Sequence, residues 1–124
     1  MISFTIPLQP ISKKNSQQIL INSKTGRPFI SPSKAFKQYE RAAMRYLPQT
    51  PKIAQAVNVK CLFYMDTRRR VDLTNLLEAI DDILVKYRVI EDDGYNIVQS
   101  HDGSRVLFDK FNPRVEIYIT DAEN

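Results

Sequence analysis

Hydrophobic and polar residues alternate in three stretches of the chain, and this pattern predicts three β-strands. Close to the N-terminus, Ile2, Phe4 and Ile6 alternate with Ser3 and Thr5. Residues 58–65 and 115–120 repeat the pattern with longer runs. Because successive side chains of a strand point to opposite faces, this alternation is typical of strands that bury one face. Weaker strand signals lie at 97–98 and 106–108.

Two other stretches have helical spacing, and a third predicts a hairpin. Apolar residues recur every three or four positions from Leu73 to Tyr87, and again from Ala35 to Leu47. The apolar triplets at 19–21 and 28–30 flank a turn that contains Gly26, which predicts a β-hairpin. The order strand, hairpin, helix, strand, helix, strands predicts a small single-domain α+β fold, a mixed sheet with two main helices.

The length and composition fit one domain. The chain has 124 residues, of which 43% are hydrophobic, enough to bury a core without a disulfide framework or a structural metal. The single cysteine, Cys61, cannot form an internal disulfide. No apolar run approaches the length of a membrane span, and no secretion signal is visible. We therefore expect a cytoplasmic protein that has no membrane partner.

The charge is distributed unevenly along the chain. Residues 1–70 contain 13 Lys and Arg and two acids, a net charge of +11, whereas residues 71–124 contain five bases and twelve acids, a net charge of −7. Such an asymmetry predicts a polyanion-binding half beside an acidic site. The alternative is that both blocks are simply solvated surface.

Two groups of bases are suited to binding phosphate. One group follows helical spacing and forms a stripe on one side of the first predicted helix: Lys34, Lys37, Arg41 and Arg45. The other is the run Arg68-Arg69-Arg70, whose guanidinium groups match the geometry of phosphate. The alternatives are an ordinary solvent-facing helix surface and a charged loop.

Seven acids lie close together in the second half of the chain: Asp72, Glu78, Asp81, Asp82, Glu91, Asp92 and Asp93. Neighbouring carboxylates relieve their repulsion by raising a pKa or by binding a divalent cation. Mg²⁺ prefers carboxylate oxygens and keeps coordination positions for a phosphate, which is the chemistry of phosphodiester hydrolysis. The cluster therefore predicts a metal-dependent site.

A helix over 72–87 is about 22 Å long, so Asp72 and Asp93 can converge only if the chain turns back at once after the helix or if the helix ends a turn early. The alternatives are that Asp72 is a helix N-cap and that Glu91 to Gly94 is a solvated turn. His101 is the only histidine and has no partner at ligand spacing, so a zinc site is not expected. The sequence has no glycine-rich phosphate loop, so we expect no nucleotide cofactor.

The stretch from Arg68 to Leu84, followed by Glu91-Asp92-Asp93, resembles the RusA family of Holliday junction resolvases. That family carries a basic run, then D-x-D-N, a helix, and an aspartate pair some 20 residues later. The similarity extends over nearly the whole chain as one domain, 1–124, and includes the Gly26-Arg27-Pro28-Phe29 hairpin. It implies a homodimeric, Mg²⁺-dependent endonuclease of bacterial or prophage recombination and repair. Such an enzyme binds four-way DNA junctions and resolves them by paired symmetric nicks.

The resemblance assigns roles by position and also shows departures from the family. Asp72 and Asp93 match catalytic aspartates and metal ligands, and Asp92 or Glu78 would assist in holding the metal. Thr74 stands where the family has its second aspartate, Glu78 where it commonly has lysine, and Arg88 where glycine is usual. The residues expected to contact DNA are Lys13, Lys14, Asn15, Arg27, Lys34, Lys37, Arg41, Arg68, Arg69 and Arg70.

Two alternatives to the nuclease stay open. Loss of one metal ligand at Thr74 would leave a junction-binding protein of the same fold with impaired or absent nuclease activity, unless Glu78 restores the missing carboxylate. A metal-dependent hydrolase of small phosphorylated substrates is the third hypothesis, although 13 bases in one half exceed what a small ligand needs.

Overall fold

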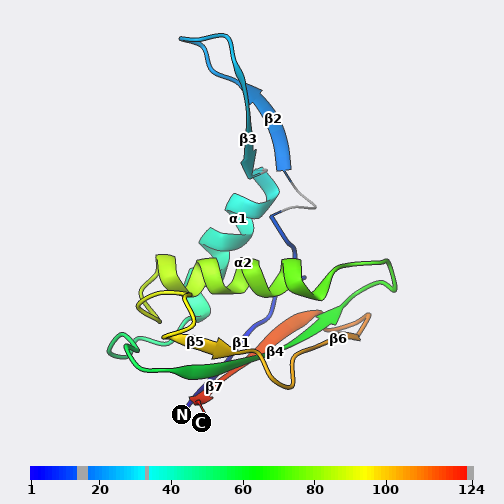
Figure 1. Ribbon diagram of the computed structural model, residues 1–124. Helices are drawn as coiled ribbons and strands as arrows, with labels where there is room; N and C mark the ends of the chain where they lie inside the picture. The colour runs from blue at the N-terminus through cyan, green and yellow to red at the C-terminus, as the bar shows by residue number, and fades with distance from the viewer. Residues whose placement is uncertain (14–16, 33, 123–124) are drawn as a thin grey trace.

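The main body of the molecule is a five-stranded mixed sheet covered by a helix. The computed structural model describes residues 1–13, 17–32 and 34–122. The strand order is β1-β7-β4-β5, and β6 pairs with β4 farther along the same edge. The first and last strands, β1 and β7, are neighbours in this sheet (Figure 1). The strands of this sheet are β1 (Ile2–Ile6), β4 (Val57–Met65), β5 (Val98–Ser100), β6 (Arg105–Phe108) and β7 (Arg114–Asp121).

The pairing directions make the sheet mixed, as the sequence predicted. β7 runs antiparallel to both β1 and β4, whereas β5 and β6 run parallel to β4. The helices are α1 (Lys34–Ala43) and α2 (Leu73–Lys86), with a short 3-10 turn, η2 (Met44–Tyr46), after α1. The predicted α+β class with two main helices is therefore confirmed. No helix in the described part of the chain is long and apolar enough to span a membrane.

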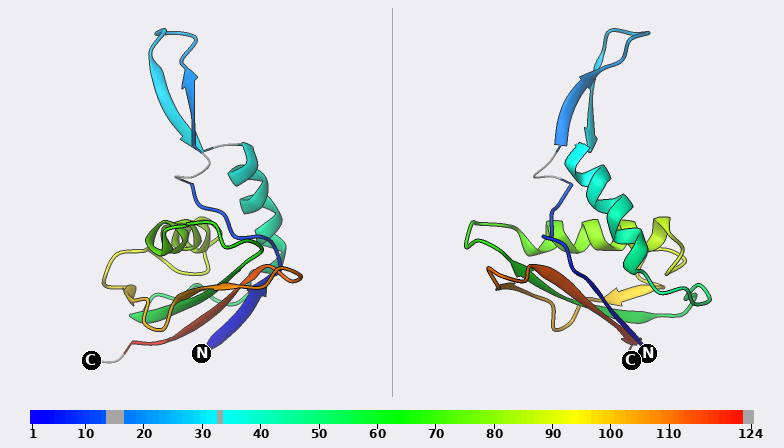
Figure 2. Two further views of the ribbon diagram at one scale, coloured as in Figure 1. Left: turned by 90° about the vertical axis from the view of Figure 1, so that its right-hand side faces the viewer. Right: turned by 180° about the vertical axis from the view of Figure 1, so that it is seen from behind.

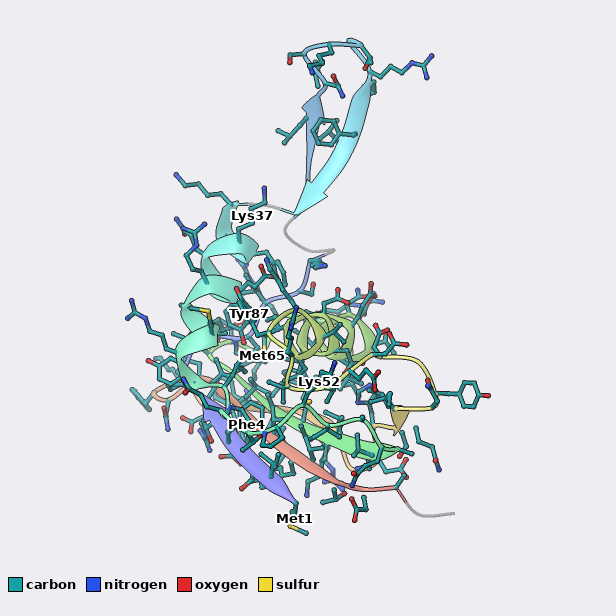
Figure 3. The ribbon with its side chains drawn as sticks, turned by 90° about the vertical axis from the view of Figure 1, so that its left-hand side faces the viewer. Met1, Phe4, Lys37, Lys52, Met65 and Tyr87 are labelled. Carbon is teal, nitrogen blue, oxygen red and sulfur yellow. The ribbon has the colours of Figure 1, made fainter. Side chains whose placement is uncertain are left out.

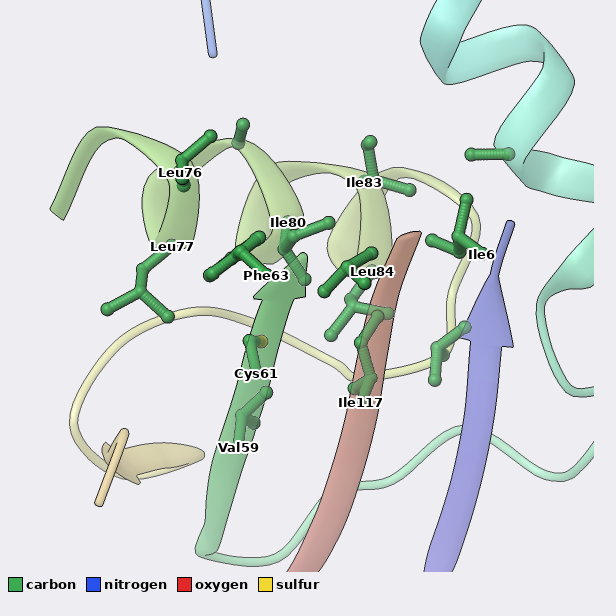
Figure 4. Packing of buried hydrophobic residues seen from close by; sticks show 14 of the residues in the cluster. Ile6, Val59, Cys61, Phe63, Leu76, Leu77, Ile80, Ile83, Leu84 and Ile117 are labelled. Carbon is green, nitrogen blue, oxygen red and sulfur yellow. The ribbon is translucent and has the colours of Figure 1, made fainter. Parts of the chain in front are cut away.

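The core lies between α2 and the sheet. Every second residue of β4, from Val57 to Met65, is buried, which is the alternation read from the sequence. Ile80 and Leu84 of α2 point toward Phe63 and Ile117 of the sheet (Figure 4). Burying one such side chain contributes about 1.5–3 kcal/mol to folding. Cys61 lies at the centre of this core with no exposed surface.

A two-stranded hairpin projects from this body, far from the sheet (Figures 1 and 2). It consists of β2 (Gln17–Ile21) and β3 (Pro28–Pro32), paired antiparallel, and it forms a separate sheet. Gly26 in its turn has a φ of +70°, a conformation that glycine adopts without strain. The predicted hairpin is confirmed, and we call residues 17–32 the arm.

Candidate functional site

The two ends of α2 hold the two principal acidic residues predicted from the sequence. Asp72 occupies the N-cap position, and Asp93 follows the reversal of the chain after the C-terminal end. The reversal occurs at Arg88, whose φ is +61°, and the N–H groups of Val89 and Ile90 both donate to the Leu84 carbonyl. Ile90 then pairs with Ile53 at the far end of the fold.

The chain therefore turns back but does not return to the start of α2. Asp93 lines the same cavity as Asp82 and Tyr87, which belong to the last turns of the helix. Since each residue of a helix adds 1.5 Å, this cavity lies roughly 15 Å or more from Asp72. A single chain does not bring Asp72 and Asp93 together.

A cavity of about 650 Å³ opens between the two helices, and we call it the α1–α2 cleft. Phe36 and Val85 line its apolar wall, and Tyr87 lies between the helices (Figure 3). Four residues predicted from the sequence meet here: Lys13, Lys37, Arg41 and Asp93. Asp82, a member of the predicted acidic cluster, also lines the cleft, and the structure adds two charged residues that were not predicted as part of a site, Glu40 and Lys86.

Ion pairs join the walls of the cleft. Lys13 Nζ lies 2.8 Å from Asp82 Oδ2, which ties the N-terminal segment to α2. Lys86 Nζ donates to Glu40 Oε1, which ties α2 to α1, and this hydrogen bond raises the pKa of Lys86. Within the described ranges no carboxylate pairs with Lys37 or Arg41, which are both exposed. These two cations are therefore available to an anion at the mouth of the cleft.

The N-terminal end of α2 is more open. The Asp72 side chain is 55% exposed and makes no capping hydrogen bond. Its Oδ2 accepts a hydrogen bond from Asn75 Nδ2 at 3.3 Å, and its Oδ1 lies 3.9 Å from Arg70 Nε. The capping alternative therefore does not explain this residue. Arg68 stacks over the ring of Phe108 at 4.2 Å, and Arg69 and Arg70 line a second cavity, of about 590 Å³.

The other predicted residues lie outside both groups. Glu78 is exposed on α2 between the two ends, and Asp92 is exposed in the turn beside Asp93. Arg27 lies in the turn of the arm, and Lys34 is exposed at the first position of α1. Lys14 and Asn15 lie outside the described residues. No three His, Cys, Asp or Glu side chains in the described ranges are close enough together to hold a metal ion.

A pair formed by the buried carboxylate of Asp81 and the partly buried ring of His101 was not predicted. His101 Nδ1 donates to the Val59 carbonyl at 2.8 Å, and His101 Nε2 lies 2.9 Å from Asp81 Oδ2. The bond to Asp81 raises the pKa of His101, and burial raises the pKa of Asp81. The charge of Asp93 also acts on Asp81, so the pair lies near the acidic wall of the cleft. It joins α2 to β4 and to the loop after β5.

The sequence contained a signal for part of this pair. Asp81 follows Leu77 by four positions and precedes Leu84 by three, which places it at the edge of the apolar face of the helix. A carboxylate at such a position needs a partner. Nothing in the spacing identified His101 as that partner, because the contact depends on the pairing of β4 with β5 and β6.

Comparison with known proteins agrees with the sequence resemblance. A family model described as Endodeoxyribonuclease RusA matches residues 7–120. The match includes the arm, both helices and both ends of α2. A search of curated proteins found no match.

Proposed function

Because the chain belongs to the RusA endodeoxyribonuclease family of Holliday junction resolvases, we propose that it binds four-way DNA junctions and cuts their phosphodiester bonds. The family match covers residues 7–120 of the 124-residue chain. We further propose that it acts as a homodimer that nicks two opposed strands. A two-fold axis suits this substrate, because it presents equivalent sites to two equivalent strands.

The observation that carries this proposal is a series of exposed cations in the turn of the arm, on α1 and on η2, which we call the cationic ridge. It begins in the turn of the arm and continues along α1, and Figure 3 shows Lys37 at the end of α1 nearest the arm. The sequence has no acid before Glu40, whose carboxylate pairs with Lys86. Such a series matches the repeated phosphates of a DNA backbone. The ridge comprises Lys24, Arg27, Lys34, Lys37, Arg41 and Arg45.

Nucleases of this family are generally dependent on a divalent metal, and we propose Mg²⁺ for this chain. The carboxylates of a single chain do not fit one ion, because Asp72 is at one end of α2 and Asp93 at the other. We therefore propose that the homodimer assembles the site, with Asp72 from one copy and Asp93, assisted by Asp92 or Glu78, from the other. Within each copy, Lys13 and Lys86 hold the walls of the cleft, and Lys37 and Arg41 bind phosphate at its mouth.

The test is cleavage of a synthetic four-way junction, compared with a linear duplex of the same sequence, in the presence of Mg²⁺. We expect nicks in the junction, and we expect Asp93→Asn and Asp72→Asn each to abolish them. Asp102→Asn is the matched control, because Asp102 is an exposed aspartate on a different loop. Binding that does not change with salt concentration would contradict a DNA role, since phosphate contacts release counterions.

A junction-binding protein with impaired or absent nuclease activity is the second candidate. It is favoured by Thr74 and Glu78, which replace an aspartate and a lysine of the family pattern. Under this hypothesis the protein binds the four-way junction more tightly than the duplex, and neither substrate is nicked. Cutting that is indifferent to the junction would contradict both candidates.

A further inference from the structure

The arm exposes apolar side chains that the body of the protein does not cover. The exposed fractions are 73% for Ile19, 72% for Ile21, 37% for Leu20 and 45% for Phe29. The arm projects away from the sheet and α2 in every view (Figures 1 and 2). An isolated two-stranded hairpin is only marginally stable in water, so an apolar surface of this kind indicates a binding partner.

The apolar side chains lie on both faces of the arm. Leu20 pairs with Phe29 and therefore shares a face with it, whereas Ile19 and Ile21 point to the opposite face. A partner that docked on one face would leave the other face in water. Apolar groups on both faces fit a ligand that contacts the arm from two sides.

Hydrogen bonds close the turn of the arm. The Asn22 N–H donates to the Arg27 carbonyl at 2.9 Å, and the Gly26 N–H donates to the Asn22 carbonyl at 2.8 Å. Asn22 Oδ1 accepts hydrogen bonds from the N–H groups of Lys24 and Thr25, at 2.8 and 3.2 Å. Backbone and side-chain hydrogen bonds therefore connect the two strands of the arm at its tip.

The charge of the arm selects the class of partner. The arm contains Lys24 and Arg27 and no acid, and it is the outer end of the cationic ridge. A polyanion that also offers apolar surfaces is DNA whose base faces are accessible. A continuous duplex stacks its base pairs and hides those faces, whereas a four-way junction interrupts the stacking at its branch point.

We propose that the arm inserts into the open branch point of a four-way DNA junction and sets the preference for junctions over duplex. This inference rests on the proposed function. Leu20 and Phe29 contact base faces on one side, and Ile19 and Ile21 do so on the other, as apolar wedges do in proteins that unstack DNA. Lys24 and Arg27 hold the neighbouring phosphates.

The experiment compares equilibrium binding of a four-way junction and of a linear duplex by the full-length protein and by a Leu20→Ala/Phe29→Ala variant. We expect junction affinity to fall about tenfold or more, the usual effect of losing base stacking, and duplex affinity to change less than about twofold. Phe111→Ala is the matched control, because Phe111 is an exposed phenylalanine on the body, 91% exposed. It should leave both affinities unchanged.

A second readout locates the arm directly. The fluorescence of 2-aminopurine at the branch point should rise when the wild-type protein binds and should not rise with the double variant. If the double variant loses affinity equally for the junction and the duplex, or loses no affinity, the inference is overturned. A lower molecular mass of the DNA-free variant in analytical ultracentrifugation would also overturn it, because that result would assign the arm to contacts between copies of the chain. If the wild-type protein binds neither DNA, the proposed function fails; if it binds both equally, only the role of the arm fails.

Discussion

The two ends of α2 carry the same kind of residue in different surroundings. Among the described residues, the Asp72 side chain at the N-terminal end has polar contacts with its sequence neighbours Arg70 and Asn75 only, and it is largely exposed. At the C-terminal end, Asp82 pairs with Lys13, and Asp93 lies in the same cleft between α1 and α2. One end is therefore built from local contacts, and the other from segments far apart in the chain.

This difference explains why neither end looks like a complete catalytic site. The C-terminal end has carboxylates, cations and a cavity, but it lacks the acid at the start of the helix. The N-terminal end has that acid and three arginines, but no second carboxylate contacts Asp72 within the described ranges.

The largest expected effect is on cleavage. Asp72→Asn and Asp93→Asn should each lower the rate of junction nicking at least about a hundredfold, as expected for loss of a group that stabilises the transition state. If the site combines residues of two copies, mixing the two variants should restore part of the activity. Half of the dimers then contain one chain of each variant, and each mixed dimer has one intact site. About a quarter of the wild-type number of sites should therefore be active. The measurement is the nicking rate after the mixed chains have exchanged.

The same mixture offers a readout that does not depend on catalysis. Binding of Mn²⁺, followed by electron paramagnetic resonance, should be lost in each variant and partly regained in the mixture. No recovery of either signal would show that both carboxylates act within one chain. Asp102→Asn mixed with wild-type protein controls for effects of subunit exchange.

The second prediction concerns the pair that supports the C-terminal end. His101→Ala should lower the free energy of unfolding by about 1–3 kcal/mol, because it leaves Asp81 buried without its hydrogen-bond partner. Urea unfolding at pH 6 measures this effect. Gln99→Ala is a suitable control, since Gln99 is an exposed neighbour on β5. A loss no larger than that of the control would show that the pair does not stabilise the fold.

The third prediction is the pH dependence of the same pair. The pKa values of His101 and Asp81 are both raised in the folded protein, so the folded chain holds more protons than the unfolded chain. The stability that protonated His101 contributes to the folded protein is fully present below pH 6.5, and it is lost as the pH rises through the raised pKa of His101 in the folded state. Stability should therefore fall from pH 6.5 upward, and His101→Ala should flatten this dependence. Wild-type stability that rises over this range would contradict the assignment.

A smaller effect is expected on DNA affinity. Lys37→Gln or Arg41→Gln should weaken junction binding a few-fold and reduce the slope of log affinity against log salt by about one for each phosphate that the variant no longer binds. Lys52→Gln, an exposed lysine away from the cationic ridge, should leave the slope unchanged. If all three variants have the same slope, the residues at the mouth of the cleft do not bind DNA phosphates.

The smallest effect concerns the N-terminal end of α2. Asp72→Asn should change the free energy of unfolding by less than about 0.5 kcal/mol, because the carboxylate makes no capping bond. A decrease of about 1 kcal/mol would instead indicate a cap. The thermal or urea midpoint of the variant decides between the two, and it also verifies that the variant used for the cleavage test is folded.

The sequence predicted those parts of the fold that depend on local periodicity. The alternation in β4 and β7 and the helical spacing of α2 identify the buried faces, because burial of one face imposes period 2 or 3.6. The position of Gly26 between two apolar triplets correctly predicted the turn of the arm. Periodicity does not determine which elements meet, so the Lys86–Glu40 ion pair and the parallel pairing of β5 and β6 with β4 were not predicted.

The same limit applies to the site. The acids and bases of the cleft were identified by residue type, and Lys13, Lys37, Arg41 and Asp93 do share one cavity. The distance from Asp72 to Asp93 depends on how far the chain returns after Arg88, which composition and spacing leave open. The Asp81–His101 contact joins α2 to the loop after β5, 20 positions further along the chain, so it follows from tertiary packing alone.

The buried position of Cys61 has a practical consequence for these experiments. Burial raises the pKa of its thiol, so neither the thiolate nor solvent access is available in the folded chain. Since the chain has no other cysteine, alkylation can occur only when the sheet opens, and it labels each molecule once. The labelling rate thus reports the opening free energy of the sheet without an introduced cysteine.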